Sequence, residues 1–196
     1  MAITYENTAS LSTMSAEDLA SIVSLNYLCN TQHYGINPKW NESDMAGEYA
    51  NFFVPRSTSR VITAHESNLP ESGAAVGAIL LLSTKESRAV ADSPELTAWF
   101  GDNSVDIEKC CIPHIFVSNG HYNKGIAQQL FTDAEALAVS LGFEDWILYG
   151  AFKPRVMPWF RNHFAGRWSP INDQAGVRID PIPGDVQPGA VRVRLV

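Results

Sequence analysis

The stretch Ile112–Gly142, IPHIFVSNGHYNKGIAQQLFTDAEALAVSLG, decides the fold that this sequence predicts. It opens with an apolar run, Ile115–Val117, that is typical of a buried strand, and continues into a polar turn, Ser118–Lys124. From Gly125 onward the apolar residues recur at every third or fourth position, which indicates an amphipathic helix. The apolar face of this helix consists of Ile126, Leu130, Phe131, Ala134, Leu137, Ala138 and Leu141. The sequence therefore predicts a strand, a turn and a helix that packs on a sheet.

The turn in front of this helix is a candidate anion site. The N–H groups in the first turn of a helix have no intrahelical acceptor, and the positive end of the helix dipole lies there. Phosphate groups bind readily at such a terminus, so a phosphate-bearing ligand is a natural occupant of the turn.

This arrangement resembles the acetyl-CoA-binding segment of the GNAT-type (GCN5-related) N-acetyltransferases. In that family a Gln/Arg-x-x-Gly-x-Gly/Ala loop presents backbone N–H groups to the pyrophosphate of coenzyme A. The matching positions here are Tyr122-x-x-Gly125-x-Ala127. Two residues depart from the pattern, because Tyr122 replaces the Gln or Arg and Asn119 replaces a Pro that often follows the strand. Backbone amides do most of the cradling, so acetyl-CoA or another acyl-CoA is the implied co-substrate.

The resemblance also implies which residues contact the coenzyme. In GNAT-like enzymes the pantetheine lies along the central strand as an added strand would, and a strand amide polarises the thioester oxygen. The implied contacts on the strand are Ile115, Phe116 and Val117. The implied contacts in the turn and the first helical residues are Tyr122, Asn123, Lys124, Gly125, Ile126 and Ala127.

Acetyl transfer from a thioester to an amine needs a base for the ammonium and an acid for the leaving thiolate, but no covalent protein nucleophile. Family members often use a Glu or His of the central strand as the base, and the matching candidates are His114 and Glu108. The structural alternatives are a strand histidine that is hydrogen-bonded to a neighbour and a solvated glutamate at the strand end.

The family acid is usually a Tyr in a Phe-Tyr-x-x-x-Gly-Phe context. The segment Trp159–Gly166 resembles this context, but Phe160 occupies the Tyr position and the glycine falls two residues late. Three explanations stay open. The thiolate leaves unaided, since its pKa is near the value of about 8.5 for Cys; or Tyr149, Tyr122 or His163 donates the proton; or the chemistry is not acetyl transfer.

Local patterns predict the other elements. Strands are expected at Ile3–Leu11, Ser59–Ala64, Ala75–Leu82, Glu108–Val117, Trp146–Gly150, Val177–Asp180 and Val191–Val196, the last two forming a closing antiparallel hairpin. Helices are expected from a cap at Ser15 to Cys29 or Asn30, from Asn41 to Phe53, from Pro94, and from Arg155 to Phe164. The strands on either side of the Gly125 helix should be parallel. The order matches a GNAT-like α/β (α+β) fold: a mixed, mostly antiparallel central sheet flanked by helices, with one parallel strand–helix–strand unit at the acyl-CoA site.

In GNAT-like folds the helix–loop–helix region near the N-terminus lines the acceptor pocket. The resemblance therefore implies that Tyr34 and Trp40 contact the acceptor. The structural alternative is that these loop aromatics cover the core.

Composition limits the function classes. A chain of 196 residues predicts one domain, 1–196. The 14 Lys and Arg against 21 Asp and Glu give a net charge of −7, which argues against general nucleic-acid binding. The three cysteines have no metal-ligand spacing, so no metal is expected and a reducing cytoplasm fits best. The most apolar run, Gly73–Leu82, is too short to cross a bilayer, which takes about 20 residues, and the first ten residues do not resemble a secretion signal.

The sequence thus predicts a cytoplasmic N-acetyltransferase that moves an acetyl or other acyl group directly from acyl-CoA to a small-molecule or peptide amine. The alternative is a non-catalytic GNAT-fold protein that binds coenzyme A or a macromolecular partner. GNAT-like proteins are often dimers, so the resemblance also implies a homodimer. No nucleophile-elbow motif is present, so no Ser/His/Asp triad is predicted.

Overall fold

A computed structural model of the chain describes residues 2–8, 10–34, 41–56, 58–67, 74–87, 94–152, 159, 162–171 and 187–196. These residues divide into two compact units. The first unit is Met1–Leu82 with His114–Ala136, and the second unit is Ser83–Pro113 with Leu137–Val196.

The strands of the described residues form one seven-stranded sheet in the order β1-β2-β3-β4-β5-β7-β6. Their bounds are β1 Ile3–Thr8, β2 Arg60–Glu66, β3 Gly77–Ser83, β4 Cys110–Val117, β5 Asp145–Phe152, β6 Trp168–Ile171 and β7 Gln187–Arg194. Most neighbours are antiparallel, while β4 and β5 run parallel with Cys110 opposite Asp145. The predicted mixed, mostly antiparallel sheet with one parallel strand–helix–strand unit is therefore confirmed.

Both N-terminal helices begin where the sequence placed a cap. Helix α1 (Ala16–Tyr34) follows Ser15, whose Oγ accepts from the Asp18 N–H at 3.0 Å. Helix α2 (Glu42–Glu48) follows Asn41, which shares a reciprocal capping box with Asp44, and a π-helical turn then extends to Phe53. Helix α1 continues to Tyr34, several residues past its predicted end.

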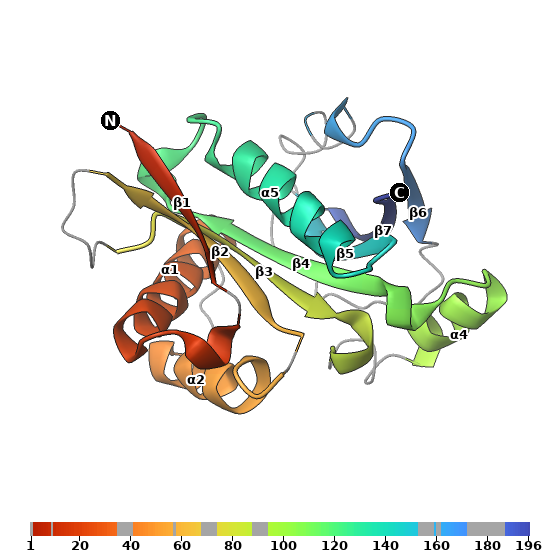
Figure 1. The fold of residues 1–196 in the computed structure, drawn as a ribbon, viewed down its shortest axis with the longest axis horizontal. Coiled ribbons are helices and arrows are strands. Elements are labelled where there is room, and N and C mark those ends of the chain that lie inside the picture. Colours follow the sequence, from red (N-terminus) through yellow and green to blue (C-terminus); the bar gives the residue numbers. More distant parts are fainter. Residues whose placement is uncertain are drawn as a thin grey trace. The chain divides into compact units, whose positions relative to one another are not determined.

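The first unit carries helices on both faces of its strands, with α1 and α2 on one side and α5 (Ile126–Ser140) on the other (Figure 1). Every residue of β3 is buried, as its unbroken apolar run predicted. Ala78 and Leu80 belong to the cluster that includes Ile22 of α1. On the opposite face, a Cβ added at Gly77 would lie 2.9 Å from Ile126 Cγ2. Glycine at this position therefore lets α5 approach the sheet closely.

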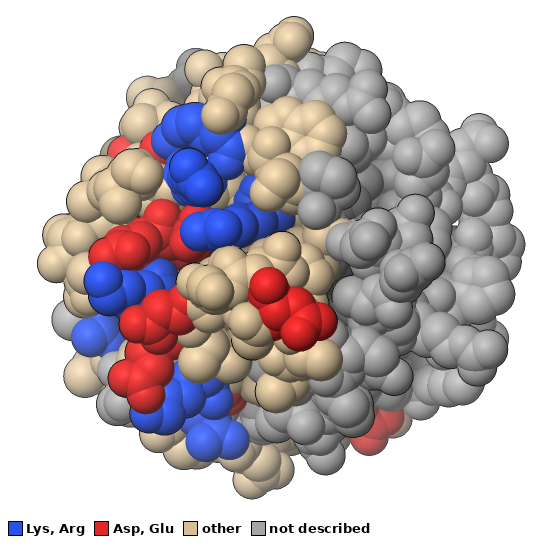
Figure 2. All heavy atoms as spheres, turned by 90° about the vertical axis from the view of Figure 1, so that its right-hand side faces the viewer, with Lys and Arg blue, Asp and Glu red and all other residues tan. Residues whose placement is uncertain are grey.

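The second unit has its own core and a paired charged surface. It contains α4 (Pro94–Asp102), which starts at the predicted Pro94. Its core cluster consists of Phe100, Val105, Cys110, Ile112, Ile147 and Ile171. Figure 2 shows Lys and Arg interspersed with Asp and Glu on the described part of one face of the molecule. Pairs in the second unit include Lys85 with Glu108 at 2.6 Å and Lys109 with Glu144.

The prediction that Val191–Val196 pairs with Val177–Asp180 in a closing hairpin is wrong. Strand β7 pairs with β5 on one side, with Val191 opposite Leu148, and with β6 on the other, with Val191 opposite Pro170. Both edges of β7 are thus occupied there, so Val191–Val196 cannot pair with Val177–Asp180, which lies outside the described residues. The sequence missed β6 because this strand has only four residues and contains a proline, which is confined to edge or bulged strand positions.

Two further predictions need adjustment. Strand β4 starts at Cys110, not at Glu108, because Ile107–Lys109 forms a 3-10 turn whose Glu108 N–H donates to the Asp106 side chain at 3.0 Å. The helix predicted for Arg155–Phe164 falls mostly outside the described residues. Of the residues in this range that the structure describes, Trp159, Asn162 and His163 are helical. In the part of the chain that the structure describes, no helix has the length and apolar character to cross a membrane.

Candidate functional site

The turn between β4 and α5 is fixed by backbone hydrogen bonds within the first unit. The Ser118 N–H donates to the Val76 carbonyl at 2.9 Å, which ties the end of β4 to the residue before β3. A single 3-10 turn, η5 (Asn119–His121), follows, and the His121 N–H donates to the Ser118 carbonyl at 2.9 Å. The start of the turn therefore has a defined conformation.

The end of the turn exposes its backbone. Asn123 and Gly125 have φ values of 59° and 77°, a left-handed conformation that Asn tolerates and Gly adopts without strain. A Cβ added at Gly125 would have no heavy atom within 4 Å. The Gln129 N–H donates to the Gly125 carbonyl at 3.0 Å, so the N–H groups of Ile126–Gln128 are the first-turn donors that lack an intrahelical acceptor. Open space beside donors at a helix N-terminus suits an anion.

The residues predicted to contact the coenzyme include both exposed and buried side chains. Asn123 and Lys124 are exposed, whereas Ile115, Tyr122 and Ala127 are half-buried. Phe116, Val117 and Ile126 are buried; Phe116 packs in the α1 cluster and Ile126 lies beside Gly77. The side chains of these three residues are therefore shielded from a ligand.

His114 lies on β4, three residues before its end, and its side chain is half-buried. Desolvation lowers the pKa of His114 to about 4, from an ordinary value of 6.5. The imidazole is thus neutral at pH 7. An efficient general base has a pKa near the working pH, and the pKa of His114 is far below it. Burial therefore weakens the base role that the position on the strand favoured.

The other predicted site residues are described one by one. Glu108 belongs to the second unit, is exposed, and pairs with Lys85 at 2.6 Å. Tyr149 lies on β5 opposite Ala190, and Tyr34 is the last residue of α1; the structure describes the backbone of both but neither side chain. Trp40 lies outside the described residues.

Cysteine and metal chemistry find no support among the described residues. Cys29, Cys110 and Cys111 are free and buried. Burial raises the pKa of Cys29 to about 11 and that of Cys110 to about 12, so these thiols stay protonated at neutral pH. Within the described ranges, no three His, Cys, Asp or Glu side chains are grouped so that they could hold a metal ion.

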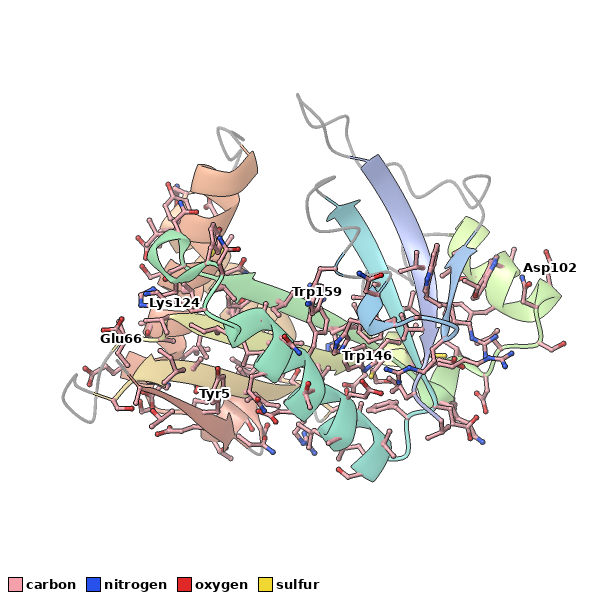
Figure 3. All side chains as sticks on the ribbon, turned by 90° about the horizontal axis from the view of Figure 1, so that it is seen from above. Tyr5, Glu66, Asp102, Lys124, Trp146 and Trp159 are labelled. Carbon is pink, nitrogen blue, oxygen red and sulfur yellow. The ribbon has the colours of Figure 1, made fainter. Side chains whose placement is uncertain are left out.

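The sequence analysis did not predict one polar network in the first unit. Ser118 Oγ lies 2.6 Å from His121 Nδ1, and His121 Nε2 is hydrogen-bonded to the carboxylate of Glu66 at the end of β2. Figure 3 shows Glu66 near Lys124 at the end of the strands where the turn lies. The only local signal was a Ser and a His three positions apart, since Glu66 is 55 positions from His121.

Comparison with known proteins gives a result at the level of structure. No family model matches the sequence, and no curated protein matches it. Among solved structures, an acetyltransferase of the GNAT family from Staphylococcus aureus Mu50 matches with a TM-score of 0.64 at 10% identity, with 100% of both chains covered. The chain has the GNAT fold.

Two further GNAT-fold structures agree along nearly the whole chain. A chimera of the spermidine N-acetyltransferase SpeG from Vibrio cholerae and hSSAT has a TM-score of 0.63 at 14% identity, covering 98% of this chain and 95% of the other. YncA from Salmonella typhimurium, a candidate acetyltransferase whose structure contains its cofactor acetyl-CoA, has a TM-score of 0.61 at 12% identity, covering 100% and 95%. The predicted resemblance is confirmed for the fold.

Proposed function

We propose that this chain, 1–196, acts as one domain that transfers an acetyl or other acyl group from acyl-CoA directly to an amine. The observation that supports this most is the turn before α5. On a GNAT fold, it combines open space at Gly125 with the free donors of a helix N-terminus.

The coenzyme fits the residues of the turn. The N–H groups of Ile126, Ala127 and Gln128 would hold the pyrophosphate, and the exposed Lys124 would pair with a phosphate. Backbone groups of Ile115–Val117 would hold the pantetheine. When bound, acyl-CoA supplies a thioester whose acyl carbon the amine attacks.

We further propose a cationic amine as the acceptor, because the net charge of −7 favours such a ligand and one GNAT-fold neighbour is a spermidine N-acetyltransferase. His114 and Tyr149 stay the proposed base and acid. The lowered pKa of His114 makes it a weak base, so its substitution should affect the rate only modestly. We assign no catalytic role to Glu108, which is exposed and paired with Lys85.

Substitution Gly125→Glu tests the coenzyme site. It would place a carboxylate over the phosphate cradle and should weaken acetyl-CoA binding at least tenfold, by about 1.4 kcal/mol or more. Isothermal titration calorimetry measures this loss directly.

The matched control is Gly142→Glu, after the last turn of α5. Gly142 also has a positive φ, 86°, and open space, so this variant carries the same backbone strain and charge change without touching the turn. Its acetyl-CoA affinity should equal that of the wild type. Equal affinity in the two variants would refute the proposed site.

A thiol-release assay distinguishes acyl transfer from the alternative of a non-catalytic binding protein. Acetyl-CoA is incubated with a panel of amines that begins with spermidine, and free coenzyme A thiol is measured. Release that depends on the amine supports transfer, whereas acetyl-CoA binding without release from any amine favours a binding protein.

A further inference from the structure

Three side chains of the first unit form a continuous hydrogen-bonded chain that the proposed function does not use. Ser118 Oγ lies 2.6 Å from His121 Nδ1, and His121 Nε2 is bonded to Glu66 Oε1. The His121 and Glu66 side chains are only 17% and 21% exposed, so solvent competes weakly for these bonds. Ser118 is also half-buried.

The donor and acceptor roles of the two ring nitrogens depend on the tautomer of His121. We assign the ring proton to Nε2, which faces Glu66, so that the neutral imidazole offers Nδ1 as an acceptor. The Ser118 hydroxyl then donates to Nδ1. This is the order nucleophile, base and orienting carboxylate, which defines a serine triad by geometry and not by sequence position. The ring nitrogens are exchanged relative to the serine proteases, but either nitrogen of a neutral imidazole can accept a proton.

The Ser118 side chain does not serve the local backbone in the usual way. Ser118 is the N-cap residue of η5, where a serine oxygen ordinarily accepts from a backbone N–H two or three residues ahead. No such side-chain cap bond forms here, and the Ser118 hydroxyl is bonded to His121 instead. The His121 N–H donates to the Ser118 carbonyl, so the turn is closed without the hydroxyl.

Open space lies beside the backbone two residues after Ser118. A Cβ added at Gly120 would meet no heavy atom within 4 Å, so no neighbouring group covers the backbone at this position.

We propose that Ser118, His121 and Glu66 form a nucleophilic triad that accepts an acyl group from an activated ester or thioester. This activity is separate from direct transfer to an amine and does not require coenzyme A. Glu66 is a positioning residue, because it acts through His121.

The proposed reaction balances in two steps. Ser118 Oγ bonds to the acyl carbon while its proton passes to His121 Nδ1, and the bond to the leaving alcohol or thiol breaks as that group takes the proton. Water then attacks the acyl-serine, its proton passes through His121 to Ser118 Oγ, and a carboxylic acid leaves.

The test uses p-nitrophenyl acetate, which carries an activated acetyl group and no part of coenzyme A. The wild-type protein should release a burst of p-nitrophenol equal to the protein concentration, and mass spectrometry should place one acetyl group on Ser118. Ser118→Ala should lose both the burst and the label. Because the probe lacks coenzyme A, its outcome is independent of the acetyl-CoA titration described above.

Matched controls separate chemistry from folding. Ser140→Ala removes an exposed serine whose Oγ donates to the Leu137 carbonyl, and it should leave the burst unchanged. Glu66→Gln keeps the shape of the side chain and an oxygen for His121 Nε2–H, and it should slow acylation by about tenfold or more while the label stays on Ser118. A folded wild-type protein that shows no acetyl group on Ser118, or an equal burst from Ser118→Ala, would overturn the proposal.

Discussion

Two histidines of the first unit, seven positions apart, have opposite surroundings. His114 lies within β4, where desolvation lowers its pKa to about 4. His121 lies in the turn after that strand, with a serine hydroxyl on one ring nitrogen and a carboxylate on the other. Burial disfavours a proton on His114, whereas His121 has the hydrogen-bond partners of the triad that we propose. For acyl transfer to Ser118 we therefore expect His121, and not His114, to act as the base.

The largest expected effect is on Ser118 acylation. His121→Gln removes the acceptor of the Ser118 proton and should slow the p-nitrophenol burst by about 10²- to 10⁴-fold, the usual contribution of a general base. His114→Gln should leave the burst rate unchanged, because the Ser118 hydroxyl is hydrogen-bonded to His121. Stopped-flow absorbance of p-nitrophenol measures both rates.

Thermal unfolding of the two variants provides the control, since a rate loss in an unfolded protein has no meaning. If His114→Gln slows the burst as much as His121→Gln does, the contrast between the two histidines is wrong.

The next effect is on stability against pH, and it concerns His114. Its folded-state pKa is lowered to about 4, so the unfolded chain binds this proton more tightly. The stabilisation is fully present above about pH 6.5 and is lost as the pH falls towards 4. The free energy of unfolding should therefore decrease over this window, by at most about 3 kcal/mol from this residue.

Urea unfolding at pH 7, 5.5 and 4 measures the dependence. His114→Gln has no proton to bind, so its stability should fall less steeply than that of the wild type over the same pH range. Parallel pH curves for the two proteins would mean that His114 is not desolvated in the folded state.

The part of the fold that could be predicted depended on short-range patterns. The strand, turn and helix from Ile115 to Ser140 follow from apolar spacing, and the caps at Ser15 and Asn41 follow from a reciprocal bond over three residues. Strand β6 has four residues and too little pattern to predict, so β7 was given the wrong neighbour.

In the candidate site, too, local features could be predicted and features that depend on distant segments could not. The turn at Gly125 was predictable because its backbone requirement is local. The network at Ser118 was not, because Glu66 reaches His121 through the pairing of distant segments. The lowered pKa of His114 also depends on tertiary burial, which a strand pattern does not report.

The smallest expected effect concerns Glu108, whose carboxylate is paired with Lys85. Glu108 meets Lys85 at 2.6 Å in solvent, where side-chain entropy and salt screening offset most of the attraction. Glu108→Gln should therefore leave the urea midpoint, the p-nitrophenol burst and amine-dependent thiol release unchanged within error. Glu66→Gln, by contrast, should slow the burst, because Glu66 is half-buried and its carboxylate is hydrogen-bonded to His121 Nε2. A loss of thiol release in Glu108→Gln alone would return that residue to the catalytic site and would show that exposure in the free protein is no guide to its role.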